Sequence, residues 1–193
     1  TRETLAFTVA PPSDRTYLAA GPGQEIFVAL QSANRVKKIA PQFGAISTYV
    51  GDGEYAYSPD GALASSSSFR WPAGLAVDSE GNLFVAAGQN SQIRRVDSKT
   101  GLLSSIAGTG DAGYAGDGGP ASEAAMRSPS GLALDVAGNI VFADLANHAI
   151  RVIDATTKKI STIAGSGVSG FFGDGGPATR AGLDAPEGIF VDR

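Results

Sequence analysis

The residues of this chain that could do chemistry are few, and they form no catalytic set in the sequence. His148 is the only histidine, and the chain has no cysteine. A typical zinc site takes most of its three or four ligands from His and Cys, and one His without any Cys cannot supply them. No Gly-x-Ser-x-Gly elbow is present that would pair a nucleophilic serine with His148. We therefore predict no catalytic residue and no metal site, and a structural or binding role for His148.

Aspartates that recur among glycines are the second candidates. Asp117 and Asp174 lie in identical Gly-Asp-Gly-Gly-Pro-Ala segments, and Asp60 occupies the same place earlier in the chain. Such loops suggest calcium, which binds oxygen ligands. Each loop offers few acids, however, and no Asp-x-Asp-x-Asp run gathers several oxygens on one ion. We predict no cofactor, with calcium as the alternative, and interpret these aspartates as turn residues that accept backbone N–H groups.

All of these residues belong to an internal repeat. The segment Gly74–Asp78 returns as Gly131–Asp135 and again as Gly188–Asp192, each time 57 residues further along. Residues 74–130 and 131–187 pair without a gap and share 26 identities. A fixed period of this kind is typical of propellers, solenoids and arrays. The predicted organisation is an extension outside the repeat over residues 1–16, units over 17–73, 74–130 and 131–187, and the first strand of a further unit over 188–193.

The third unit shows what one repeat contains. Its short apolar segments alternate with turns rich in Gly, Asp, Asn and Thr, which predicts four consecutive antiparallel strands. The predicted strands cover residues 131–135, 139–144, 149–154 and 160–164. A long glycine-rich stretch follows, and its counterpart after Pro120 is typical of a single helical turn. Asp78, Asp135 and Asp192 close the first strand of successive units, and we interpret them as hairpin caps.

Four-stranded repeated units are the components of β-propeller blades, so we predict an all-β fold made of four-stranded antiparallel blades, about three of them in this chain. The repeat also resembles the NHL-repeat β-propellers. The residues that carry this resemblance are Gly131–Asp135 with the preceding proline, Gly138-Asn139, Asn147–Arg151, Ser161–Gly165 and Gly173–Ala178. The long Gly-Asp-Gly-Gly-Pro-Ala loop is similar to repeats of bacterial secreted or surface proteins and of teneurin-like receptors.

The resemblance implies more than a fold class. It implies a closed ring of about six blades, completed by missing blades or by a second copy of the chain. It also implies an extracellular or cell-surface location. It does not specify an activity, because this propeller carries enzymes, RNA binders and adhesion modules.

The composition limits the classes of partner that the chain is expected to bind. The chain has 15 basic and 19 acidic residues and a net charge of −4, which does not favour nucleic-acid binding. No apolar stretch approaches the ~18 residues of a membrane-spanning helix. We predict a non-enzymatic binding or scaffold module of a larger protein, with a protein or carbohydrate partner. The alternative is a metal-dependent hydrolase or lyase whose site lies in the propeller channel and takes ligands from further blades.

The turns between the second and third strands of each unit are the candidate binding surface. They vary between units while the surrounding residues repeat, as expected for loops that carry recognition. The candidate residues are Gln31, Asn34, Gln89, Asn90, Asp144, Asn147 and His148. Trp71, the only tryptophan, precedes an inner strand and would add an aromatic contact if it is exposed.

Overall fold

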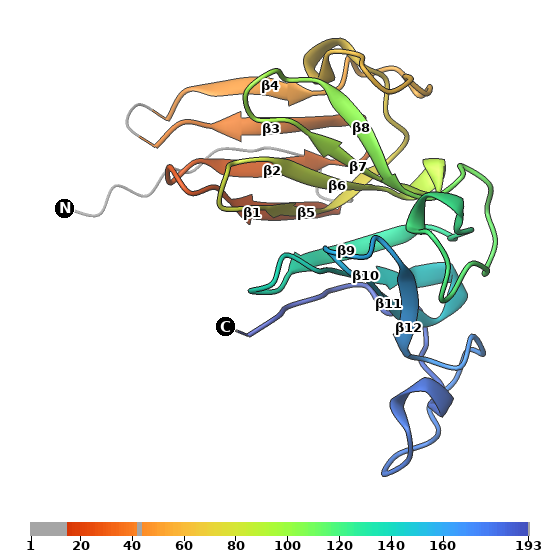
Figure 1. Ribbon diagram of the computed structural model, residues 1–193. Coiled ribbons are helices and arrows are strands. Elements are labelled where there is room, and N and C mark those ends of the chain that lie inside the picture. Colours follow the sequence, from red (N-terminus) through yellow and green to blue (C-terminus); the bar gives the residue numbers. More distant parts are fainter. Residues whose placement is uncertain (1–14, 42–43, 193) are drawn as a thin grey trace.

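The computed structural model describes residues 15–41 and 44–192, and these residues form three four-stranded antiparallel sheets (Figure 1). Within each sheet the strands follow chain order, so every strand pairs with its sequence neighbour. We call the sheets blade 1, blade 2 and blade 3. Blade 1 contains β1 (Thr16–Ala20), β2 (Ile26–Leu30), β3 (Arg35–Ile39) and β4 (Ile46–Val50); blade 2 contains β5 (Pro72–Val77), β6 (Leu83–Ala87), β7 (Gln92–Val96) and β8 (Leu103–Ala107); blade 3 contains β9 (Pro129–Leu134), β10 (Ile140–Asp144), β11 (Ala149–Ile153) and β12 (Ile160–Ala164).

The all-β fold of four-stranded antiparallel blades is confirmed, and the strands of blade 3 lie within two residues of their predicted limits. The inner strands of blades 2 and 3 begin two residues before the limits that we set for their units, at Pro72 and Pro129, and β1 begins one residue before its limit, at Thr16. Of the predicted extension over 1–16, residues 1–14 lie outside the described part of the chain, and Thr16 already belongs to β1. Residues 188–192 lie after blade 3 and are not assigned to a strand.

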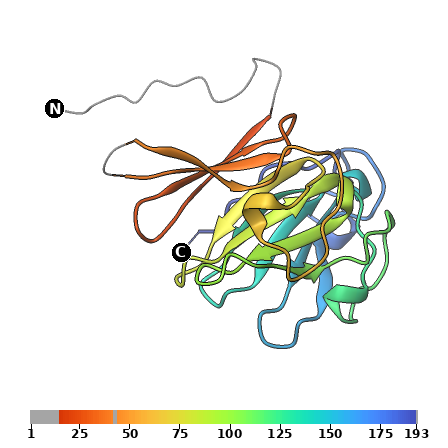
Figure 2. The same cartoon turned by 90° about the horizontal axis from the view of Figure 1, so that it is seen from above.

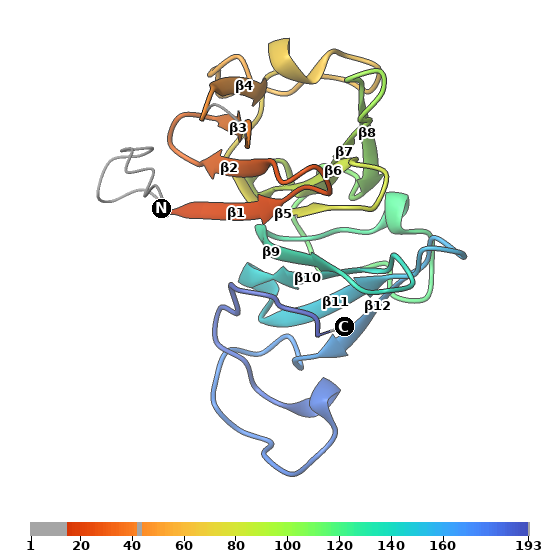
Figure 3. The same ribbon diagram turned by 90° about the vertical axis from the view of Figure 1, so that its left-hand side faces the viewer.

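The inner strands β1, β5 and β9 pack side by side (Figure 3). Glycine permits this close approach. A Cβ on Gly74 would collide with the Ser130 carbonyl oxygen, and a Cβ on Gly131 would collide with the Glu187 carbonyl oxygen. Seen from above, each sheet is turned relative to the next (Figure 2). The repeated glycine therefore allows the chain of the next unit to lie directly against each inner strand.

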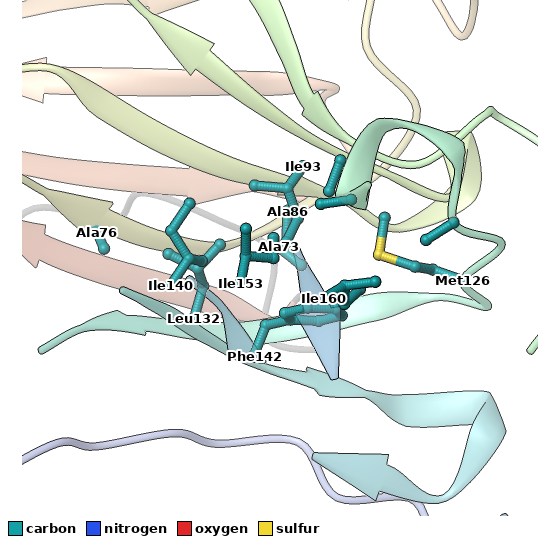
Figure 4. Packing of buried hydrophobic residues seen from close by; sticks show 13 residues of the cluster. Ala73, Ala76, Ala86, Ile93, Met126, Leu132, Ile140, Phe142, Ile153 and Ile160 are labelled. Atoms are coloured by element: carbon teal, nitrogen blue, oxygen red, sulfur yellow. The ribbon is translucent and has the colours of Figure 1, made fainter. Parts of the chain in front are cut away.

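The core lies between the blades. Phe27 and Val50 of blade 1 face Leu83 and Val96 of blade 2. Between blades 2 and 3 the core contains Ile93 and Ala86 from one side and Phe142, Ile153 and Ile160 from the other (Figure 4). The strands are buried here because each blade has an apolar face that only the neighbouring blade covers.

A connector with one 3₁₀ turn follows each blade: η1 (Ala64–Ser66), η3 (Ala121–Glu123) and η5 (Ala178–Arg180). Pro120 immediately precedes η3, as predicted for a short helical turn. The connector after blade 2 pairs with the outer strand of blade 3, since the Gly118 N–H donates to the Ile160 carbonyl. The connector after blade 1 does the same on blade 2, through the Gly61 N–H and the Leu103 carbonyl. The connectors after blades 1 and 2 therefore pack on the blade that follows them in sequence.

Candidate functional site

The candidate residues lie in the turns that join the second and third strands. In blades 2 and 3 these turns contain the 3₁₀ segments η2 (Gly88–Asn90) and η4 (Leu145–Asn147). The residue after each turn is left-handed, with φ values of 51° at Asn34, 50° at Ser91 and 52° at His148. Asparagine tolerates this region better than most residues. The backbone geometry of the turn is therefore common to all three blades.

Asn34 and His148 occupy equivalent positions and make the same contact. Asn34 Oδ1 accepts the Trp71 N–H at 3.2 Å, and His148 Nδ1 accepts the Ala185 N–H at 3.1 Å. Both donors are left-handed residues that immediately precede a proline. The side chain at this position therefore joins the turn of one blade to the chain entering the next. The structure gives Asn34 and His148 a positioning role.

Asn90 and Asp144 also share a contact, although they are not equivalent in sequence. Asn90 Oδ1 accepts the Arg70 N–H at 2.9 Å, and Asp144 Oδ1 accepts the Arg127 N–H at 2.7 Å. Asn147, the counterpart of Asn90, donates to Asp144 Oδ2 at 2.9 Å. Four of the seven candidates, Asn34, Asn90, Asp144 and Asn147, are thus buried and bonded within the protein.

Asp144 also contacts Arg151, a fully buried cation of β11. Arg151 Nη1 lies 3.3 Å from Asp144 Oδ2, and neither side chain is exposed. Burial raises the pKa of the Asp144 carboxyl, against the opposing effect of hydrogen bonds from Asn147 and Arg127 and of the Arg151 charge. A buried arginine needs several acceptors, and Arg151 also donates to the carbonyls of Ala115 and Ala125.

The strongest partner of Arg151 is Asp117, which belongs to the connector of the preceding blade. Arg151 Nη2 donates to Asp117 Oδ1 at 2.7 Å, and the Thr162 N–H donates to Asp117 Oδ2 at 3.0 Å. In blade 2, Arg94 Nη2 donates to Asp60 Oδ1 at 3.0 Å, and the Ser105 N–H donates to the same carboxylate. Asp60 and Asp117 accept backbone N–H groups, as we predicted for the glycine-loop aspartates, but the donors lie in the next blade rather than in the same turn.

The sequence analysis did not identify the arginine partners of these aspartates. Arg94 and Arg151 stand 57 residues apart, as do Asp60 and Asp117, so a signal was present in the repeat. Its meaning required the structure, because 34 residues separate each acid from its arginine. The hairpin-cap interpretation of Asp78 and Asp135, in contrast, is confirmed. Asp78 Oδ1 accepts the Glu80 and Asn82 N–H groups, and Asp135 makes the equivalent bonds.

Gln31 and Gln89 have a different environment. They line a pocket of about 600 Å³ at one end of the inner strands, together with Arg15, Tyr17 and Trp71. The Trp71 side chain is 48% exposed. Throughout residues 15–41 and 44–192, no partner donates to or accepts from the side chains of Gln31, Trp71 or Gln89. The structure thus brings two of the seven candidates to an open pocket, beside the tryptophan.

Two residues that line this pocket, Arg15 and Tyr17, bond to the Glu187 carboxylate. Glu187 Oε1 accepts hydrogen bonds from Arg15 Nη1 at 2.6 Å and from the Tyr17 hydroxyl at 2.7 Å. Burial, followed by the adjacent Glu187 carboxylate, raises the pKa of the Tyr17 hydroxyl. Tyr17 therefore stays protonated and can act as a hydrogen-bond donor at neutral pH.

Among residues 15–41 and 44–192, no three His, Cys, Asp or Glu side chains come together in a way that could hold a metal ion. None of the helices in these ranges is long and apolar enough to cross a membrane.

The blades, their strand order and their inter-blade core define a β-propeller architecture. No family model matches the chain. NHL repeat-containing protein 2 of Bos taurus is 31% identical over 160 residues, which cover 79% of this chain and 22% of that protein. The chloroplastic protein SUPPRESSOR OF QUENCHING 1 of Arabidopsis thaliana is 27% identical over 176 residues, covering 87% of this chain and 16% of that protein.

Solved structures support the same architecture. An auxiliary nutrient binding protein from Bacteroides thetaiotaomicron superposes with a TM-score of 0.64 at 19% identity, covering 91% of this chain and 42% of that one. These likenesses confirm the resemblance carried by the repeat, and the chain is built of NHL-type β-propeller blades. It spans about a fifth of the length of the bovine protein.

Proposed function

We propose that the chain is a non-catalytic binding module whose ligand enters the pocket around Trp71. The observation that carries the proposal is the exposed tryptophan that lines one pocket with two side-chain amides, Gln31 and Gln89, which bond to no side chain or backbone group among the described residues. Binding pockets characteristically combine aromatic surface with a few placed polar groups. The chemistry fits a saccharide, whose flat C–H face packs on an aromatic ring while its hydroxyls bond to amides.

Strain at the tryptophan supports the assignment. Trp71 is left-handed, with φ of 53°, and it immediately precedes Pro72. Bulky residues rarely adopt this conformation, and such outliers gather at binding sites. The equivalent residues are Ser128, with φ of 55°, and Ala185, with φ of 43°. The backbone shape is thus shared by all three units, whereas the aromatic side chain is particular to one of them.

Tryptophan fluorescence tests the proposal directly, because Trp71 is the only tryptophan in the chain. We expect one or more members of a panel of neutral and acidic oligosaccharides to shift its emission in a saturable manner. Gln31→Ala and Gln89→Ala should each weaken binding about five- to tenfold, the scale of one lost hydrogen bond. Phe171→Ala is the matched control, since this 91% exposed aromatic lies in the connector after blade 3 and does not line the pocket.

Two outcomes would contradict the proposal. Binding that persists unchanged in Gln31→Ala and Gln89→Ala by fluorescence, and in Trp71→Ala by isothermal titration calorimetry, would exclude this pocket. Conversion of a bound saccharide, seen as a new product by mass spectrometry, would instead support the channel-sited hydrolase or lyase. We also propose an extracellular or cell-surface location, which fractionation of cells that produce the protein would test.

A further inference from the structure

Two equivalent contacts join successive blades, and we call each of them an inter-blade latch. A latch consists of the aspartate of a Gly-Asp-Gly or Pro-Asp-Gly loop, the buried arginine on the third strand of the next blade, and an N–H of that blade's outer strand. One latch joins Asp60 to Arg94, and the other joins Asp117 to Arg151. In both, the arginine side chain is almost fully buried, at 2% and 0% exposure. An aromatic ring, from Tyr57 or Tyr114, stacks near each guanidinium.

Asp174 is the third aspartate of this series, and no arginine among residues 15–41 and 44–192 pairs with it. It lies in the same Gly-Asp-Gly-Gly-Pro-Ala segment as Asp117 and is exposed. Within the described ranges, no cation and no N–H group bonds to its carboxylate. The connector after blade 3, which contains Asp174, extends away from the three sheets (Figures 1 and 3).

The surface beside Asp174 repeats an interface that is filled elsewhere. Ile93 of blade 2 is fully buried against blade 3, whereas its counterpart Ile150 on blade 3 is partly exposed. The outer-strand residue Ile163 is 43% exposed. Gly131 is the counterpart of Gly74, and it already lies against the chain at Glu187 and Ile189, as Gly74 lies against β9. The apolar face and the carboxylate thus repeat the surface that blade 2 offers to blade 3, and the chain that leads on from blade 3 already runs beside its inner strand.

We propose that Asp174 is the carboxylate half of a third latch, and that it receives an arginine from a further blade of the same repeat joined in register through Gly188–Asp192. Charge complementarity and continuity with the two existing interfaces identify this occupant. A guanidinium reaches one carboxylate through two nitrogens, as Arg151 does through Nε and Nη2. A buried cation in this position also needs the aromatic ring beside it, which Phe171 and Phe172 would supply from the Asp174 connector.

A second copy of the chain fits this surface less well. Its blade 1 would present Lys37 at the arginine position, and Lys37 Nζ already donates to Thr48 Oγ1 at 2.7 Å. An ammonium on a flexible stem does not reproduce the bidentate fork of arginine. The latch therefore favours a blade with the sequence pattern of blades 2 and 3 over a second copy's blade 1.

The test extends the whole chain by one blade. A second copy of residues 137–193 placed after Arg193 continues the repeat without a gap and adds one arginine equivalent to Arg151. We expect the added blade to dock, and its outer strand to exchange amide hydrogens as slowly as β12. In this extended chain, Asp174→Asn should reduce the protection of the added outer strand against amide exchange about tenfold or more, because a largely buried guanidinium loses its carboxylate partner. Exchanging the charges, with Asp174→Arg and the added arginine changed to aspartate, should restore part of it.

The matched control is the same substitution in the 193-residue chain. There Asp174→Asn should leave protection unchanged, while Asp117→Asn should lower it in both chains. Equal effects of Asp174→Asn in the two chains would overturn the proposal, because the aspartate would then act within its own connector. A second result would also overturn it. If analytical ultracentrifugation shows that the 193-residue chain self-associates and that Asp174→Asn abolishes the association, the occupant is a second copy.

Discussion

The connectors after blades 2 and 3, residues 108–129 and 165–186, are identical at 11 of 22 positions and have the same local structure, but different surroundings. Each contains one 3₁₀ turn, η3 or η5, and each has the same glycine-loop hydrogen bond. Ala121 and Met126 of the first connector are buried beneath blade 3. Their counterparts Ala178 and Leu183 are exposed and partly buried. Local sequence therefore forms the connector, whereas its contribution to stability depends on the blade that packs against it.

The two latch arginines differ in a similar way. Arg151 has two carboxylate partners, Asp117 and Asp144, and its Nε donates to the first of them. Within the described part of the chain, Arg94 has one carboxylate partner, Asp60, and its buried Nε has no hydrogen-bond partner. The position of Asp144 is occupied by Ala87 in blade 2. Burial lowers the pKa of the Arg94 guanidinium, against the effect of Asp60. The equivalent site is thus better satisfied in blade 3 than in blade 2.

The largest expected effect tests this difference between the arginines. Arg151→Met should lower the free energy of unfolding by about 3–5 kcal/mol, because it leaves the fully buried Asp144 carboxylate without its cation. Arg94→Met should lower it by less, since Asp60 is half exposed and can be hydrated. Urea denaturation measures both values, with exposed Arg180→Met as the control. Equal losses at the two sites would show that the second carboxylate contributes nothing.

The next effect concerns the connectors. Met126→Ala should cost about 2–5 kcal/mol, because it opens a cavity between blades 2 and 3. Leu183→Ala should cost clearly less, since the Leu183 side chain is already partly in contact with solvent. The midpoints and slopes of urea denaturation report on both variants. A loss at Leu183 as large as that at Met126 would mean that the second connector is packed in solution.

A third pair of variants compares the inner-strand glycines. Gly131→Ala should destabilise the protein by about 1–3 kcal/mol, because the new methyl group would collide with the Glu187 carbonyl oxygen. Gly188→Ala should have no measurable effect, since nothing lies near its Cβ position. Thermal unfolding followed by circular dichroism is sufficient for this comparison. Destabilisation by Gly188→Ala would show that another strand already occupies that site.

The smallest expected effect is on the pH dependence of stability, to which Asp117 and Asp144, the two carboxylates bonded to Arg151, contribute with opposite signs. Burial raises the pKa of Asp144. Burial also acts to raise that of Asp117, but hydrogen bonds from Thr162 and Arg151 lower it overall. Asp117 therefore stabilises the fold above its unfolded pKa of about 3.9, and this contribution disappears as the pH falls through the lower folded value. Asp144 instead favours folding when protonated, and that contribution disappears as the pH rises from about 3.9 through the higher folded value.

Urea midpoints at a series of pH values separate these two contributions. Asp117→Asn should flatten the rise in stability with pH below about pH 4. Asp144→Asn should remove an opposing decline above about pH 4. Slopes that change in the same direction in both variants would contradict the different environments of the two carboxylates.

Much of the fold could be predicted because it depends on local patterns. The strands of blade 3 follow from short apolar segments and their turns, and the caps at Asp78 and Asp135 use N–H groups within four residues. The candidate turns were found for the same reason. The roles of Asn34 and His148 within them could not be predicted, since their N–H partners lie 37 residues away in the chain.

The sequence by itself determined the repeating unit and the strand order, because these depend on periodicity and on turn chemistry. Only the tertiary structure decided which polar groups are available. Packing one blade on the next buries Arg94, Arg151 and Asp144, and a buried charge must find a partner wherever the fold brings one. The same packing leaves Trp71, Gln31 and Gln89 around an open pocket and Asp174 on an exposed connector. Availability for a ligand or a further blade is thus set by contacts between units, which no single unit contains.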